Sequence, residues 1–160
     1  MLSVHLQALV LLIASNAAPV VLSKLMRERA GTPLDFGYTL PDGERLFGDH
    51  KTWRGLFFGI AVSALVSSVL GVAAWIGVGF AAASLLGDAL SSAVKRRMRL
   101  RPGTEVPGLD QIGEALLPLV LFADLLSLRF WGIVAVTVAF ILIDLAMTRL
   151  RQAPWLDRPS

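Results

Sequence analysis

The chain has 160 residues, of which 55% are hydrophobic and only 17% are charged, and its mean hydropathy is +0.66. Soluble domains carry about 25% charged residues, so this composition predicts a membrane protein. The absence of cysteine excludes disulfides and thiolate metal sites, and two histidines are too few for a zinc site without carboxylate ligands. The net charge of +3 does not predict nucleic-acid binding, because the basic residues cluster beside apolar segments and so favour anionic lipid headgroups.

Apolar segments long enough to cross a bilayer follow one another along the chain. Residues 2–22 carry no charge apart from a possible proton on His5, and no basic residues precede them as they would in a cleaved signal peptide. The forty residues from Gly55 to Val94 contain one charged residue, Asp88, and fit two helices better than one. We therefore expect an all-α, polytopic membrane protein with five transmembrane helices in a single domain over residues 1–160. The expected helices are about 2–24, 54–73, 76–97, 110–126 and 130–150, and the expected functional loops are about 25–53 and 98–109.

The basic residues predict the orientation in the membrane. Fourteen of the fifteen lysines and arginines fall in the two long loops or after the last apolar segment, and only Arg129 falls on the other side. The positive-inside rule then places both loops and the C-terminus in the cytoplasm and the N-terminus outside. The expected location is the cell (inner) membrane, with the active site on its cytoplasmic side.

Four of the expected helices carry a polar residue at a similar depth, within the inner third of the bilayer. They are Asn16, Asp88, Glu114 and Asp144. An ionised side chain at that depth costs a few kcal/mol, so it should face a partner, a metal or a wet cavity. Depth alone does not show that the four share one face. Asn16 either contacts a ligand or, as the residues alone favour, joins its helix to a neighbour.

The spacing of Asp88, Ser92 and Lys95 puts them on one face of a helix. This stripe could line an entry for an anionic headgroup, or Asp88 could simply pair with a basic residue. Asp88 and Asp110 bracket a strongly basic stretch, and Pro107-Gly108 turns the chain back between them. If that loop folds back, two carboxylates meet beside lysines and arginines, which is what Mg²⁺ on a nucleoside triphosphate requires.

The first loop, TPLDFGYTLPDGERLFGDHKTWRG, combines glycines with both charges. Its glycines allow tight turns, and its cations Arg45, Lys51 and Arg54 suit phosphates. Its aspartates could hold Mg²⁺, bind a base or sugar, or brace those cations. The loop is not a Walker A motif, because no glycine-rich turn ends in Gly-Lys-Ser/Thr.

Two motifs resemble those of the CDP-archaeol synthases, the CTP-dependent cytidylyltransferases of archaeal ether-lipid synthesis. PLDFG…DGERLFGDHKTWRG resembles their first loop, GDALSSAVKRR…PGLDQ their second, and Asn16-Ala-Ala-Pro19 their first-helix Asn-x-x-Pro. The second motif is also similar, more distantly, to the phosphatidate cytidylyltransferase signature. Gln111 departs from that signature, which has Arg there, and the His-Gly-Gly before its last aspartate is missing. The departures place the chain nearer the archaeol enzymes.

The resemblance implies transfer of the CMP moiety of CTP to a membrane lipid phosphate, with Mg²⁺ as cofactor. The implied metal ligands are Asp88 and Asp110, which with Lys95 and Lys51 form the implied catalytic set. The implied substrate-binding residues are Asn16, Asp35, Asp42, Arg45, Thr52, Ser92 and Arg96. The implied partners are CTP, the lipid phosphate and the membrane, with no nucleic acid.

Two other functions compete with this interpretation. A small ion or solute transporter would explain the polar layer at Asp88, Glu114 and Asp144, but not the patterned first loop. A CDP-alcohol phosphotransferase would need an Ala-Arg and further aspartates at helical spacing, which DGERLFGDHK lacks. Whether the lipid is ether- or ester-linked, how cytosine is selected and the oligomeric state stay open at this point.

Overall fold

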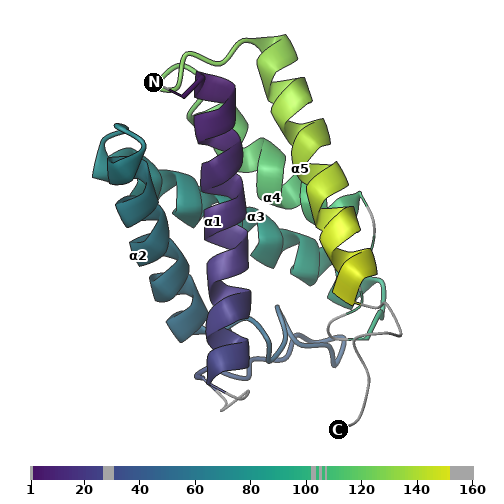
Figure 1. Cartoon of the computed structure of the whole chain (residues 1–160). Helices are drawn as coiled ribbons and strands as arrows, with labels where there is room; N and C mark the ends of the chain where they lie inside the picture. Colours follow the sequence, from purple (N-terminus) through teal and green to yellow (C-terminus); the bar gives the residue numbers. More distant parts are fainter. Residues whose placement is uncertain (1, 27–30, 102–103, 105, 107, 152–160) are drawn as a thin grey trace, which may run out of the picture.

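The computed structural model describes residues 2–26, 31–101, 104, 106 and 108–151. Five helices make up most of this part of the chain: α1 (Val4–Leu25), α2 (Trp53–Val69), α3 (Ala74–Arg97), α4 (Leu109–Leu121) and α5 (Phe130–Arg151). Figure 1 shows α1 in front of the bundle between α2 and α5, with α3 and α4 behind it, and the first loop crossing the end where α1 stops and α2 starts. The predicted all-α class and the five helices are confirmed.

Two helices end earlier than expected. α2 stops at Val69 because the chain turns through Gly71, whose φ of 76° is left-handed. α4 stops at Leu121 rather than 126, and the chain turns there to reach α5, with Ser127 left-handed at φ 53°. α1, α3 and α5 are long and apolar enough to cross a membrane. The 17 residues of α2 and 13 of α4 are shorter than a straight crossing needs, so five crossings and their direction remain predictions.

Glycine and serine let α3 lie against two neighbours at close range. A Cβ at Gly77 would collide with Ser67 and the backbone of Ser63 on α2, so these two helices approach closely through small residues. Gly87, at the end of the small-residue run AAASLLG, instead meets the backbone of Gly113 on α4. α3 is therefore held between α2 and α4.

The close packing of α1 on α2 depends on Pro19. Its ring lies 3.3 Å from the positions that a Cβ would take at Gly55 and at Gly59. A proline inside a helix has no N–H for the carbonyl four residues earlier, and the Ser15 carbonyl oxygen is 3.2 Å from the same Gly59 position. The bare backbone of α2 accommodates both groups.

The first loop is organised around the carboxylate of Asp35, whose side chain is fully buried. Asp35 accepts hydrogen bonds from the backbone amides of Gly37, Phe47 and Gly48, at 3.1, 3.0 and 3.2 Å, and forms an ion pair with Arg45. Burial acts to raise the pKa of this carboxyl, but the Arg45 guanidinium and the three amides outweigh burial and hold the pKa well below its ordinary value. Two isolated bridges, Pro33 to Thr52 and Thr39 to Arg45, complete the loop.

We predict that Gly87→Ala destabilises the protein, because the added methyl group must push α3 and α4 apart. Overpacking of this kind costs roughly 1–3 kcal/mol. Thermal unfolding of the purified protein in detergent measures the effect, and Leu86→Ala, an exposed neighbour on the same helix, is the control. Equal melting temperatures for Gly87→Ala and the wild type would show that the helices can separate at no cost.

We predict that Asp35→Asn loosens the first loop. Asp49→Asn should loosen it only weakly, because the Asp49 side chain is 78% exposed and its ion pair is with Nη1 of Arg45. A carboxyl whose pKa is depressed by folding stabilises the fold above its unfolded pKa of about 4 and loses that effect as pH falls through the lower folded pKa. Amide hydrogen exchange of residues 37–48 at neutral pH, and again near pH 4, measures this. Wild-type protection that disappears well above pH 4, or equal effects of both substitutions, would contradict the role assigned to Asp35.

Candidate active site

The polar residues expected at one depth are connected in space. Asn16 Nδ2 on α1 donates to Ser84 Oγ on α3, at 2.9 Å, and Ser84 Oγ donates to the backbone carbonyl of Glu114 on α4, also at 2.9 Å. Gln111 Nε2 on α4 donates to Asp144 Oδ2 on α5, at 2.8 Å. The hydrogen bonds of Asn16 thus join helices, as the residues alone favoured. Ser84 supplies the link that sequence reasoning missed, since it lies in a run that reads as simple packing.

Asp88 is matched by a lysine from the first loop rather than from its own helix. Lys51 Nζ contacts Asp88 Oδ2, and both side chains are largely buried. An ion pair at this depth needs its partner, because removal of one charge leaves the other uncompensated in a medium of low dielectric. The Lys51–Asp88 pair therefore fastens the first loop to α3.

Asp110, at the start of α4, is matched by Lys95. Lys95 Nζ lies 2.7 Å from Asp110 Oδ1 and donates to the backbone carbonyl of Thr104 at 3.0 Å. The amide of Val106 donates to Asp110 Oδ2 at 3.0 Å. Lys95 thus turns toward α4 and the second loop. Asp88 and Lys95, which were expected on one face of α3, therefore pair with different partners, Lys51 and Asp110. Gly108 makes the predicted turn at φ 93°, whereas Pro107 lies outside the described residues.

Arg96 and Ser92 are buried beside this pair. Arg96 is only 2% exposed and donates through Nη2 to the carbonyl of Arg101 at 2.7 Å. Its Nε and the hydroxyl of Ser92 have no hydrogen-bond partner among the residues that the structure describes. Buried donors are normally hydrogen-bonded, so these two donors are available to the acceptor groups of a ligand.

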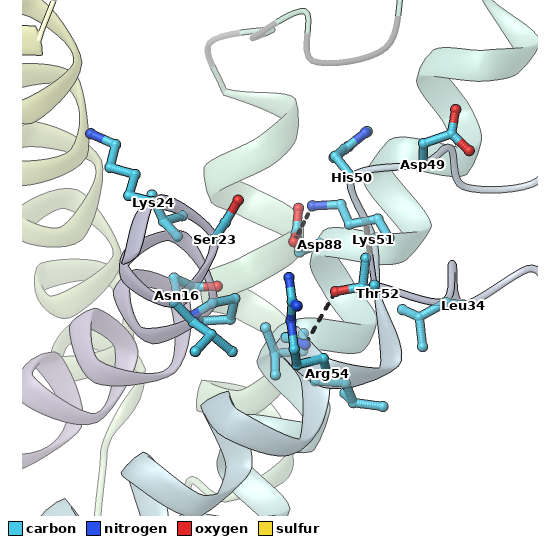
Figure 2. Close-up of a pocket in the computed structure, with 17 residues that line it drawn as sticks. Asn16, Ser23, Lys24, Leu34, Asp49, His50, Lys51, Thr52, Arg54 and Asp88 are labelled. Atoms are coloured by element: carbon cyan, nitrogen blue, oxygen red, sulfur yellow. Dashed lines mark hydrogen bonds and ion pairs between the residues drawn. The ribbon is translucent and has the colours of Figure 1, made fainter. Parts of the chain in front are cut away.

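A cavity of about 590 Å³ opens between α1, α2, α3 and the first loop. Figure 2 shows Ser23, Arg54, Lys51 and Asp88 converging on it, with Asn16 at its base. Its lining also includes apolar residues, among them Pro19, Leu56 and Leu85. A cavity lined by both charged and aliphatic groups suits an amphipathic ligand.

The cavity contains some of the predicted site residues and not others. Asn16, Lys51, Thr52 and Asp88 line it. Thr52 also caps α2, its Oγ1 accepting from the Gly55 amide at 3.2 Å. The predicted residues outside its walls are Asp35, Asp42, Arg45, Ser92, Lys95, Arg96 and Asp110. Asp42 instead pairs with Arg97, at 3.2 Å.

Five polar residues of the cavity wall are not among the predicted site residues: Ser23, Lys24, Asp49, His50 and Arg54, of which the sequence had indicated only Arg54 as suited to phosphates. The unbroken run Gly-Asp-His-Lys-Thr-Trp-Arg was the available signal, since three of the five flank Lys51 and Thr52. His50 connects the two groups of charges. Crowding by protein atoms lowers the pKa of His50 to about 4, although part of the ring reaches solvent, and the charge of Lys51 lowers it next, with Lys95 and Arg96 adding to the effect and Asp88 opposing it. The imidazole is therefore neutral at physiological pH.

The donor set is suitable for Mg²⁺. Asp88 and Asp110 offer carboxylate oxygens, the ligands that this ion prefers, and Mg²⁺ in nucleotide enzymes is typically held by one or two carboxylates together with substrate phosphates and water. Within the described residues, three or more acidic or histidine side chains do not come together as a ready metal site. Of the two carboxylates, Asp88 lines the cavity and Asp110 lies outside its walls, and each is paired with a lysine.

Comparisons with known proteins point to one family. The family model described as CarS-like CDP-archaeol synthase matches residues 1–78. The CDP-archaeol synthase of Pyrococcus furiosus is 39% identical over 109 residues, which are 62% of this chain and 62% of that protein. The CDP-archaeol synthase of Sulfolobus acidocaldarius is 34% identical over 157 residues, which are 90% of this chain and 91% of that protein.

A solved structure shares the fold. It is described as an intramembrane enzyme for archaeal membrane lipids biosynthesis, and it superposes with a TM-score of 0.75 at 32% identity over 89% of this chain and 90% of that one. Similarity over nearly the whole length, in sequence and in structure, shows that this chain is a multi-pass membrane protein that belongs to the CDP-archaeol synthase family.

Proposed function

We propose that the inner end of the bundle is where this chain carries out the reaction of its family. As a member of that family, the chain is a cytidylyltransferase, which transfers the CMP moiety of CTP to a membrane lipid phosphate and releases pyrophosphate. The observation that carries the location is the half-polar, half-apolar cavity walled by Lys51 and Asp88. It can admit a charged nucleotide and the end of a lipid together.

The cations give this site its chemistry. Lys51, Lys95 and Arg96 all act electrostatically on His50, so the three cations belong to one region at the inner end of the bundle. Each is engaged within the protein, Lys51 and Lys95 with carboxylates and Arg96 with a backbone carbonyl. A nucleotide that brings a divalent cation to Asp88 and Asp110 would free both lysines for its phosphates. Mg²⁺ held at these carboxylates would supply neutralising charge for the triphosphate.

The chain's own residues position the reactants. A lipid phosphate oxygen attacks the α-phosphorus of CTP, the P–O bond to the β-phosphate breaks, and pyrophosphate leaves. The nucleophile is already an anion, so no general base is needed, which agrees with a neutral His50. Lys51, Lys95 and Arg96 would offset the charge that develops on the oxygens, so catalysis is mainly orientation and electrostatics.

The acceptor is a lipid phosphate of the archaetidic acid or phosphatidic acid type, presented from the cytoplasmic leaflet. The cluster of lysines and arginines at this end supports the cytoplasmic assignment. The family match does not support the transporter interpretation, and the structure gives the polar layer a different role, since hydrogen bonds within it link α1, α3, α4 and α5.

We predict that Asp88→Asn and Asp110→Asn each lower the turnover of CTP by about 10²-fold or more, the scale on which a lost electrostatic contact in an active site is felt. Asp124→Asn is the matched control, because the same chemical change then falls at the opposite end of α4. Binding of Mg²⁺–CTP by titration calorimetry provides a readout independent of turnover. Near-normal turnover and binding in both variants would remove the metal assignment.

The identity of the acceptor is tested by a panel of lipid phosphates with ether-linked prenyl chains or ester-linked acyl chains. Purified protein, CTP and Mg²⁺ are incubated with each lipid in vesicles, and pyrophosphate release is measured. We expect pyrophosphate release with both kinds of lipid phosphate, and a faster rate with one kind of chain than with the other. Absence of CTP-dependent release with every lipid phosphate would refute cytidylyl transfer by this chain.

A further inference from the structure

Three aromatic rings form a continuous row from the first loop to the surface of α2. The ring centroids of Phe36 and Trp53 are 5.9 Å apart, and those of Trp53 and Phe57 are also 5.9 Å apart. We propose that this aromatic row, Phe36–Trp53–Phe57, anchors the first loop in the headgroup region of the lipid bilayer. Neither the reaction nor the cavity accounts for the row.

The backbone holds Phe36 outward. Phe36 is 73% exposed and adopts a left-handed φ of 48°, a conformation that costs energy for a residue with a Cβ. The preceding residue, Asp35, is fixed by its buried carboxylate, and the Phe36 amide donates to the Pro33 carbonyl at 3.1 Å. The loop therefore presents a large apolar ring at its surface by construction, and burial of such a ring in a bilayer would be favourable.

The row continues an apolar face that already runs along α2. Phe57, Ala61, Leu65 and Val69 follow one another at intervals of four residues and are all exposed, Val69 at 80%. Residues at this spacing lie on one side of a helix. Trp53 is one further step toward the start of α2, and Phe36 extends the face beyond the end of the helix. In a multi-pass membrane protein, an exposed apolar face of this kind contacts lipid chains.

The chemistry of the row matches the place where it ends. Tryptophan is enriched at the membrane–water interface. Here the Trp53 Nε1 is buried and has no hydrogen-bond partner among the described residues, so Trp53 contributes its ring to the row and its N–H does not reach the headgroups. Trp53 is the first residue of α2, at the end of the bundle that the first loop crosses (Figure 1). A stack on the nucleobase of CTP is the other use for an exposed ring, but neither Phe36 nor Trp53 lines the cavity. The bilayer is therefore the occupant that the geometry favours.

The anchor would give the first loop two fixed points. One, before a nucleotide binds, is the Lys51–Asp88 ion pair, which ties the loop to α3. The other is the insertion of Phe36 into the bilayer, fifteen residues before Lys51 in the same loop. With both points held, the first-loop residues of the cavity wall stay at a fixed depth relative to the lipid phosphates. The anchor acts through position and touches neither reactant.

The test places a tryptophan at position 36 of the full chain in phosphatidylcholine vesicles. The four native tryptophans are first replaced by phenylalanine, which keeps an aromatic ring at position 53. Phe36→Trp is then compared with Tyr38→Trp, a control in the same loop that is 60% exposed and lies outside the row. Vesicles are made with or without lipids brominated near the headgroup, and iodide is the quencher in water.

We expect the emission at position 36 to shift to the blue and to be largely quenched by brominated lipid, and the emission at position 38 to be quenched mainly by iodide. Equal lipid quenching at both positions, or emission at position 36 that iodide alone quenches, would overturn the anchor. This readout requires no turnover, so it is separate from any failure of the proposed reaction.

Kinetics give a second measurement. We expect Phe36→Ser to raise the KM for lipid phosphate in vesicles by about tenfold, equivalent to ~1.4 kcal/mol, and to leave the KM for CTP unchanged. Phe36→Leu should restore most of the lipid KM, because any large apolar side chain can insert. A raised KM for CTP together with weak lipid quenching would assign the ring to the nucleotide and reject the bilayer anchor.

Discussion

Charge balance at low dielectric governs the inner end of this bundle. Asp88 and Asp110 are each buried where an unpaired carboxylate is costly, and each is matched by a lysine from a different stretch of chain. Lys51 can reach Asp88 only if the first loop folds back over α3, and Lys95 can reach Asp110 only if the second loop closes onto α4. The two ion pairs therefore determine the path of both loops.

Much of the fold follows from the sequence because its signals are long and simple. Apolar runs between charged loops define five helices, and the Pro-Gly turn correctly places the start of α4 within a residue or two. The break after α2 was expected close to Gly71, where the chain does turn, and only its position differs by a few residues. The end of α4 could not be read in the same way, because apolar residues continue past it and the tertiary structure determines where the chain turns, with Ser127 left-handed.

The site was harder to predict because charges and hydrogen bonds choose partners in three dimensions. The types of residue were apparent, and Asp88, Lys51, Thr52 and Asn16 do line one cavity. The sequence did not show which carboxylate each lysine contacts, since Lys95 contacts Asp110 although its helical spacing also suits Asp88. Asp35 looked like a ligand candidate and is the centre of its own loop, bound to three backbone amides. Gln111, a departure from the phosphatidate signature, joins the Gly108 amide to Asp144 on α5.

The contact of Pro19 with Gly59 couples two positions that lie far apart in the chain. The proline ring and the Ser15 carbonyl oxygen occupy the space that a side chain at position 59 would need. Leu85 Cδ1 on α3 lies 3.0 Å from the same position, so a larger residue at position 59 would have to displace groups on α1 and on α3 together. The cost of a substitution at position 59 therefore depends on the side chains that stand at positions 19 and 85.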